Sequence, residues 1–124
     1  MKIGVESEMD ALPEDVWNLM VDTKRWKDWK PSVNGVESSG RYIRKGTTGE
    51  IETRIGVSLP FEVTEYDEGK YWLWDIARIG ATGHRVEPVP GGTRVTLEVP
   101  VYAAAYAPVC RRSLDKIEEL TAPA

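Results

Sequence analysis

The sequence is poor in the residues that most often carry metal and covalent chemistry. Its 124 residues include one cysteine, one histidine and one phenylalanine. A single cysteine excludes an internal disulfide, and a single histidine leaves few ligands for a zinc site. The sequence therefore predicts no bound metal and no cofactor.

Motifs of several enzyme classes are also missing. The sequence has no glycine-rich phosphate loop, no dinucleotide fingerprint, no Cys-x-x-Cys, no His-Glu-x-x-His and no Gly-x-Ser-x-Gly elbow. A Ser-His-Asp triad could use only His84, and no serine lies in a supporting motif. We interpret Cys110 as a packing residue, because small buried cysteines are usually inert.

Charge and hydropathy exclude further classes. The net charge of −4 gives no electrostatic reason to expect nucleic acid as a partner. No apolar run approaches the roughly 20 residues that span a bilayer, and charge follows Met1 at once, unlike in a signal peptide. We expect one domain over residues 1–124, soluble and cytoplasmic, without integral membrane association. The composition leaves the oligomeric state open.

The first third of the chain predicts one strand and two short helices. Residues 2–8 alternate weakly, as in a strand. Pro13 fits the first turn of a helix, which carries an apolar stripe at Val16, Leu19 and Met20. A second helix over 23–28 ends before Pro31, because a proline disfavours helical geometry in the residue before it.

From Asn34-Gly35 on, the sequence alternates in the manner of strands separated by glycine turns. The predicted strands cover 36–38, 41–44, 49–59, 61–65, 70–79, 82–88 and 95–101. Short connections imply antiparallel pairing in a sheet of about seven strands. A helix from Pro108 closes the chain, so the pattern predicts an α+β fold with the helices on one face of the sheet.

Several short segments carry a resemblance to a known family. They are Val16-Trp17, Asp22, Trp26, Trp29-Lys30-Pro31-Ser32-Val33, Thr82-Gly83-His84-Arg85-Val86 and Gly91-Gly92-Thr93-Arg94-Val95-Thr96. With the order of elements, they resemble the START / pollen-allergen-like (SRPBCC) superfamily, in its branch of polyketide cyclases/dehydrases and lipid transport proteins. The resemblance implies a helix-grip fold, in which a curved antiparallel sheet wraps around the long C-terminal helix and encloses a cavity.

The excess of tryptophan, with five copies, points to candidates for the wall of that cavity. Trp72 and Trp74 share one face of a predicted strand with Arg78. Aromatic side chains at these positions would either fill a small core or line a pocket for a ring-shaped ligand. Trp17, Trp26 and Trp29 form a separate group, which we expect to clamp the short helices to the sheet edge.

The polar candidates are one histidine, one arginine and three tyrosines. His84 is predicted to point inward, either as a general acid/base or as a histidine bonded to a neighbour. Arg78 would bind a buried acid or a ligand oxyanion if inward, and is otherwise an exposed residue at a strand end. The hydroxyls of Tyr102 and Tyr106, at the mouth of the pocket, could orient a ligand or donate a proton, or else pack at the helix entrance. Tyr42, in the early part of the sheet, is a candidate of the same kind.

Three functions follow from these expectations. The resemblance implies binding of a small hydrophobic, aromatic or polyketide-like molecule, with no catalysis required. The alternative is a polyketide cyclase, aromatase or dehydratase that uses His84 in a dry pocket. A protein-interaction domain of the same fold has no specific support in the sequence.

Overall fold

The computed structural model describes residues 2–123, so Met1 and Ala124, the ends of the predicted domain, lie outside the described residues. Its elements are β1 (Lys2–Met9), α1 (Pro13–Val21), η1 (Thr23–Arg25), α2 (Trp26–Trp29), β2 (Val33–Ser38), β3 (Thr48–Thr53), β4 (Ser58–Asp67), β5 (Tyr71–Ile76), β6 (Ile79–Val89), β7 (Gly92–Pro100), η2 (Val101–Tyr106) and α3 (Ala107–Thr121). The strands of these residues form one sheet in the order β1-β7-β6-β5-β4-β3-β2. The predicted helix-grip fold is confirmed.

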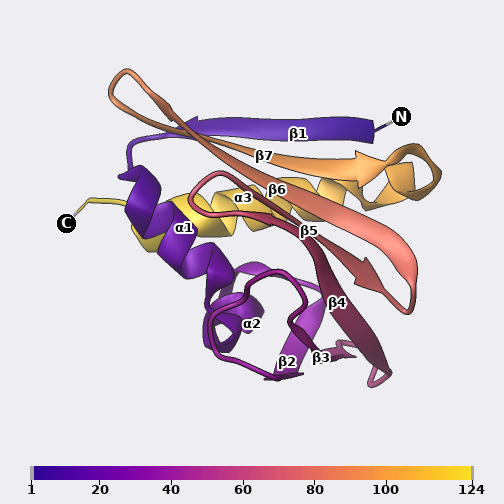
Figure 1. Cartoon of the computed structure of the whole chain (residues 1–124). Helices are drawn as coiled ribbons and strands as arrows, with labels where there is room; N and C mark the ends of the chain where they lie inside the picture. The colour runs from indigo at the N-terminus through magenta and orange to yellow at the C-terminus, as the bar shows by residue number, and fades with distance from the viewer. Residues whose placement is uncertain (1, 124) are drawn as a thin grey trace.

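Hairpins build most of the sheet, because each strand from β2 to β6 pairs antiparallel with the next one in the chain. The sheet has β2 at one edge and β1 at the other, where β1 pairs antiparallel with β7. Register shifts interrupt the pairing of β4 with β5 and of β5 with β6. Such bulges bend a sheet and increase its twist. The bent sheet lies along α3, and α1 lies beside that helix (Figure 1).

The closing helix supplies one side of the core. Its apolar stripe places Cys110, Leu114 and Ile117 among the buried residues. The cysteine is therefore a packing residue, as predicted. Burial of these side chains against the sheet stabilises the helix more than its intrinsic propensity does.

One predicted strand is in reality a hairpin. The alternating stretch 49–59 divides into the end of β3 and the start of β4, joined by a turn in which Gly56 has φ +85°. Ile55, within the predicted strand, is 86% exposed at this turn. The prediction was wrong because the alternation of apolar residues continues by coincidence through a turn that only the glycine marks.

The predicted strand 41–44 is also absent. The structure has there an isolated bridge between Asp22 and Tyr42. Backbone bonds from the Thr23 amide to the Arg41 carbonyl and from Ile43 to Val21 tie the segment to the end of α1. The segment therefore pairs with a helix terminus instead of joining the sheet.

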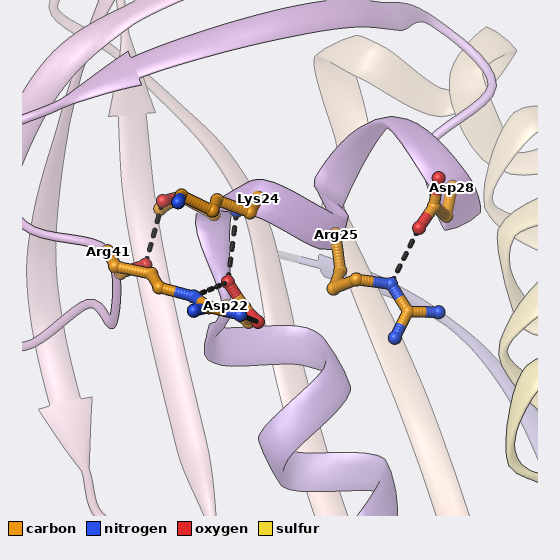
Figure 2. Close-up of polar contacts among 6 residues, drawn as sticks. Asp22, Lys24, Arg25, Asp28 and Arg41 are labelled. Atoms are coloured by element: carbon orange, nitrogen blue, oxygen red, sulfur yellow. Dashed lines mark hydrogen bonds and ion pairs between the residues drawn. The ribbon is translucent and has the colours of Figure 1, made fainter.

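A buried carboxylate organises this junction (Figure 2). Asp22 accepts from the backbone N–H of Lys24, at 3.1 Å, and so caps η1. The Arg41 guanidinium donates to both carboxylate oxygens of Asp22, at 3.0 and 2.9 Å. These bonds hold the pKa of Asp22 below its usual value. The network fixes the direction in which the chain leaves α1 and enters α2.

Candidate functional site

Three of the five tryptophans meet in the centre of the molecule, and a fourth, Trp29, lies edge-on to the neighbouring His84 at 5.9 Å between ring centroids. The indole ring of Trp26 stacks on Trp72, with 5.6 Å between ring centroids and 3° between planes. The ring of Trp74 meets both edge-on, at 5.1 and 5.7 Å. Trp29 is equally buried. We call Trp26, Trp29, Trp72 and Trp74 the tryptophan cluster.

Local geometry explains how two elements supply this cluster. Trp26 and Trp29 are three residues apart on α2, so they share one face of its single turn. Trp72 and Trp74 are two apart on β5 and share one face of the strand. Trp26 holds α2 against the sheet, as expected, but it does so by packing on Trp72 and Trp74, so the two groups expected to be separate form one cluster. Only Trp17 lies apart from the cluster, against Tyr66 at 5.7 Å.

The single histidine lies against the cluster. His84 is fully buried, and the pairing of β5 with β6 sets it opposite Trp72. The imidazole stacks on the indole of Trp72 at 3.6 Å between centroids, with 6° between the planes. The expected inward orientation of His84 is confirmed.

A buried lysine completes the site. The side chain of Lys30 is almost wholly buried, and its Nζ lies 3.2 Å from Nε2 of His84. The same Nζ lies 4.4 Å from the ring centroids of both Trp29 and Trp74, within cation–π range. Among residues 2–123 no carboxylate forms a salt bridge with Lys30.

Sequence reasoning missed Lys30 as a site residue. It noted only that Pro31 forces this position out of helical geometry, and the structure agrees, with φ −101° and ψ 101°. The extended conformation at the end of α2 sends the side chain inward beside Trp29. A lysine between a tryptophan and a helix-ending proline is the one signal that could have indicated it.

The neighbours of His84 determine its tautomer. The carbonyl oxygen of Trp72 lies 3.3 Å from Nδ1 and can only accept, so Nδ1 carries the proton and donates. Nε2 is then free to accept a hydrogen bond from the Lys30 amine. Burial and the nearby Lys30 hold the pKa of His84 well below its usual value, so the imidazole is neutral.

Burial also acts on the lysine. The loss of hydration lowers the pKa of Lys30 from 10.5 to about 7. Near neutral pH the side chain is therefore divided between ammonium and free amine. The indole faces stabilise the ammonium form, and the imidazole accepts a hydrogen bond from either form.

The site has more donors than acceptors. The indole N–H groups of Trp29, Trp72 and Trp74 are buried without a hydrogen-bond partner. Unpartnered buried donors are rare in proteins and cost stability unless something satisfies them. An oxygen acceptor, such as a carbonyl or a phenolate, would satisfy these donors.

The predicted tyrosines lie outside the buried site. The hydroxyls of Tyr106 and Ser32 lie 2.7 Å apart and join η2 to the segment just after Lys30. Tyr102 is exposed, and its hydroxyl donates to the carbonyl of Gly80 at 2.6 Å. Tyr42 is exposed at the junction with Asp22, next to a hollow of about 520 Å³.

Arg78 is not on the inward face. The predicted strand 70–79 ends at Ile76, and Ala77 and Arg78 form a turn with positive φ, at 52° and 68°. The turn reverses the chain into β6, so the alternation that placed Arg78 beside the tryptophans stops before it. The side chain is exposed.

The best-formed surface hollows of the described residues do not reach the buried site. None of these five is lined by a residue of the tryptophan cluster, by Lys30 or by His84. Nowhere in residues 2–123 do three His, Cys, Asp or Glu side chains gather as metal ligands would. Of the helices in that range, none is both long and apolar enough to span a membrane.

Comparison with known proteins identifies the type of fold. The sequence profile of the family described as polyketide cyclase / dehydrase and lipid transport matches residues 1–121. None of the curated proteins matches the chain.

Many solved structures share the architecture. A protein of Mesorhizobium loti is 16% identical, with a TM-score of 0.79 over 97% of this chain and 96% of its own. A protein of Bacillus halodurans is 12% identical, with a TM-score of 0.77 over 98% and 96%. The Aha1 dimer from Colwellia psychrerythraea is 18% identical, with a TM-score of 0.75 over 98% of this chain and 96% of its own. At these identities the likeness shows the fold alone.

Proposed function

The chain belongs to the polyketide cyclase/dehydrase and lipid transport family, and from that premise we propose that it binds a small hydrophobic, aromatic or polyketide-like molecule between the sheet and α3. The observation that carries the proposal is the Lys30–His84 pair buried within the tryptophan cluster. Flat indole faces suit a planar apolar ligand. The surplus of donors suits a ligand that carries an oxygen acceptor.

The ligand enters by displacing side chains, because the best-formed surface hollows stop short of the cluster. The segment η2 is the element best suited to move. It is exposed along much of its length, it has a non-helical residue at Ala103, and one hydroxyl contact joins it to Ser32. Tyr106 would leave Ser32 as the ligand enters, which assigns this predicted tyrosine to the entrance.

Tryptophan fluorescence tests the proposal directly, because four of the five tryptophans lie in the cluster. We expect flat aromatic ketones and phenols to change the emission in a saturable manner, and Lys30→Met to weaken their binding at least tenfold. Lys27→Met is the matched control, since Lys27 lies on the exposed side of α2. Unchanged emission across a diverse panel, or equal affinity in the two variants, would contradict ligand binding at this site.

The same pair favours a second candidate, which is general acid/base catalysis of a cyclase, aromatase or dehydratase reaction. A neutral imidazole beside an amine with a pKa of about 7 can both take and return protons near neutral pH. We expect His84→Ala to abolish turnover of a poly-β-ketone analogue while leaving ligand affinity nearly intact. Equal loss of both, or an unaltered product ratio with the native protein, would exclude this function.

A further inference from the structure

Lys30 is unusual among buried lysines in having no counter-charge. A buried ammonium ordinarily pairs with a carboxylate, because desolvation without a partner is costly. Here the hydrogen-bond partner is a neutral imidazole, and the surroundings are indole rings. This environment favours the free amine, which is a nucleophile.

We propose that Lys30 captures carbonyl ligands covalently, forming an imine with a ketone or aldehyde and an enaminone with a 1,3-diketone. The inference rests on the proposed binding site and names the reactive group of its ligand. The geometry that carries it is the contact between Nζ of Lys30 and Nε2 of His84, enclosed by the tryptophan cluster.

The reaction is balanced by the groups present. The Nζ lone pair attacks the carbonyl carbon, a C–N bond forms, and the carbonyl π electrons move to oxygen. The attacking nitrogen gives a proton to Nε2 of His84, which returns it to the oxygen to form a carbinolamine. A further proton, lost by the nitrogen, converts the hydroxyl into water as the C–O bond breaks.

The product with a 1,3-diketone is more stable than a simple imine. The carbon between the two carbonyls loses a proton, and the nitrogen keeps one, so amine and diketone give an enaminone and one water. No oxidant or reductant takes part. The second carbonyl remains as an acceptor for the unpartnered indole donors of Trp29, Trp72 or Trp74.

Two features of the site favour this step over reaction at other nucleophiles. The free amine is abundant at neutral pH, because the pKa of Lys30 is about 7. Cys110 is also a buried nucleophile, but burial raises the pKa of its thiol, so the reactive thiolate is scarce. Lys30 is 7% exposed and His84 0%, so water, which would reverse the reaction, has little access to the pair.

The test uses 2,4-pentanedione as the probe with the intact protein. We expect a single adduct with the mass of the diketone less one water, the near-ultraviolet absorption of an enaminone, and its location on Lys30 by peptide mapping. The rate should fall about tenfold per pH unit below pH 7 as the amine is protonated. Lys27→Met should keep the adduct and Lys30→Met should lose it.

Modification spread over exposed lysines, with Lys30 unlabelled in the native chain, would overturn the inference, and this result does not depend on whether the variant folds. Calorimetry with 2-naphthol, which has no carbonyl, separates this failure from failure of the proposed function. Binding of 2-naphthol without an adduct leaves the binding site and removes the covalent step. An adduct on Lys30 without 2-naphthol binding supports capture and removes non-covalent recognition.

Discussion

Lys30 and His84 show how single residues can be costly to the fold and useful to a site. Lysine is rarely buried without a charged partner, and the cost of its desolvation appears in its lowered pKa. Cation–π contacts with Trp29 and Trp74 and the bond to His84 offset part of that cost. Such local destabilisation is typical of functional sites.

Lys30→Met should therefore change how stability depends on pH. Between pH 7 and 10.5 the unfolded chain holds a proton on Lys30 that the folded chain has released, so native stability rises with pH. Below pH 7 Lys30 is protonated in both the folded and the unfolded chain, and native stability is lowered by the full free-energy cost of burying its charge. Methionine has no charge, so the free energy of unfolding of the variant, less that of the native protein, should fall by about 1.4 kcal/mol per pH unit across this window.

Urea unfolding at several pH values measures this difference. Lys27→Met is the control, because an exposed lysine carries no burial penalty, and its difference from the native protein should be flat. A flat difference for Lys30→Met as well would show that Lys30 is hydrated in solution.

At the scale of elements, short polar networks fix where each segment leaves the next. Asp22 caps η1 and binds Arg41, so it links the end of α1 to the chain that follows β2. This junction determines the course of α2, and with it the positions of Trp26 and Trp29. The Asp22–Arg41 network takes no part in the chemistry of the Lys30–His84 pair, but it supports the geometry of that pair.

Arg41→Met should lower the free energy of unfolding, since it leaves the buried Asp22 carboxylate with fewer donors. The pKa of Asp22 is lowered chiefly by its bond to Arg41. Its contribution to stability is therefore present above pH 3.8 and lost as the pH falls through the folded-state pKa. The gap between native protein and variant should close in acid.

Thermal and urea unfolding between neutral pH and pH 2 check this expectation. Arg44→Met is a suitable control, because Arg44 is exposed and makes no salt bridge within residues 2–123. If Arg41→Met were as stable as Arg44→Met, the contact between Asp22 and Arg41 would be an incidental surface ion pair.

At the scale of the whole molecule, one core serves both the sheet and the helices. The tryptophan cluster joins α2 to β5, and β6 brings His84 to it. A ligand bound in this core contacts elements from both halves of the chain. Binding should therefore stabilise the fold as a unit.

A ligand of the proposed class, present at 100 times its dissociation constant, should stabilise the native protein by about 2.7 kcal/mol. For a domain of this length that corresponds to a rise in Tm of about 10 °C. Differential scanning calorimetry with and without an aromatic ketone measures it. Lys30→Met at the same ligand concentration should show a much smaller rise, and an equal rise would move the binding site elsewhere.

The sequence by itself determined the order of the elements, the antiparallel sheet, the inward face of His84 and the break at Pro31. These follow from spacing between near neighbours, which strand alternation and proline sterics make readable. It misplaced the strands 41–44 and 49–59 and the strand position of Arg78. The reason is that a turn or a capped junction can end a strand without changing the alternation of apolar and polar residues. Spacing along the chain cannot show such a break.

Only the tertiary structure decided which distant residues meet. Lys30 and His84 are 54 positions apart, and nothing local indicates that a lysine after α2 will lie against the imidazole of β6. The pairing of β5 with β6 and the packing of α2 on the sheet bring them together. Burial then keeps the imidazole neutral and leaves Lys30 divided between ammonium and free amine near pH 7, which is a property of the folded interior and of no residue taken alone.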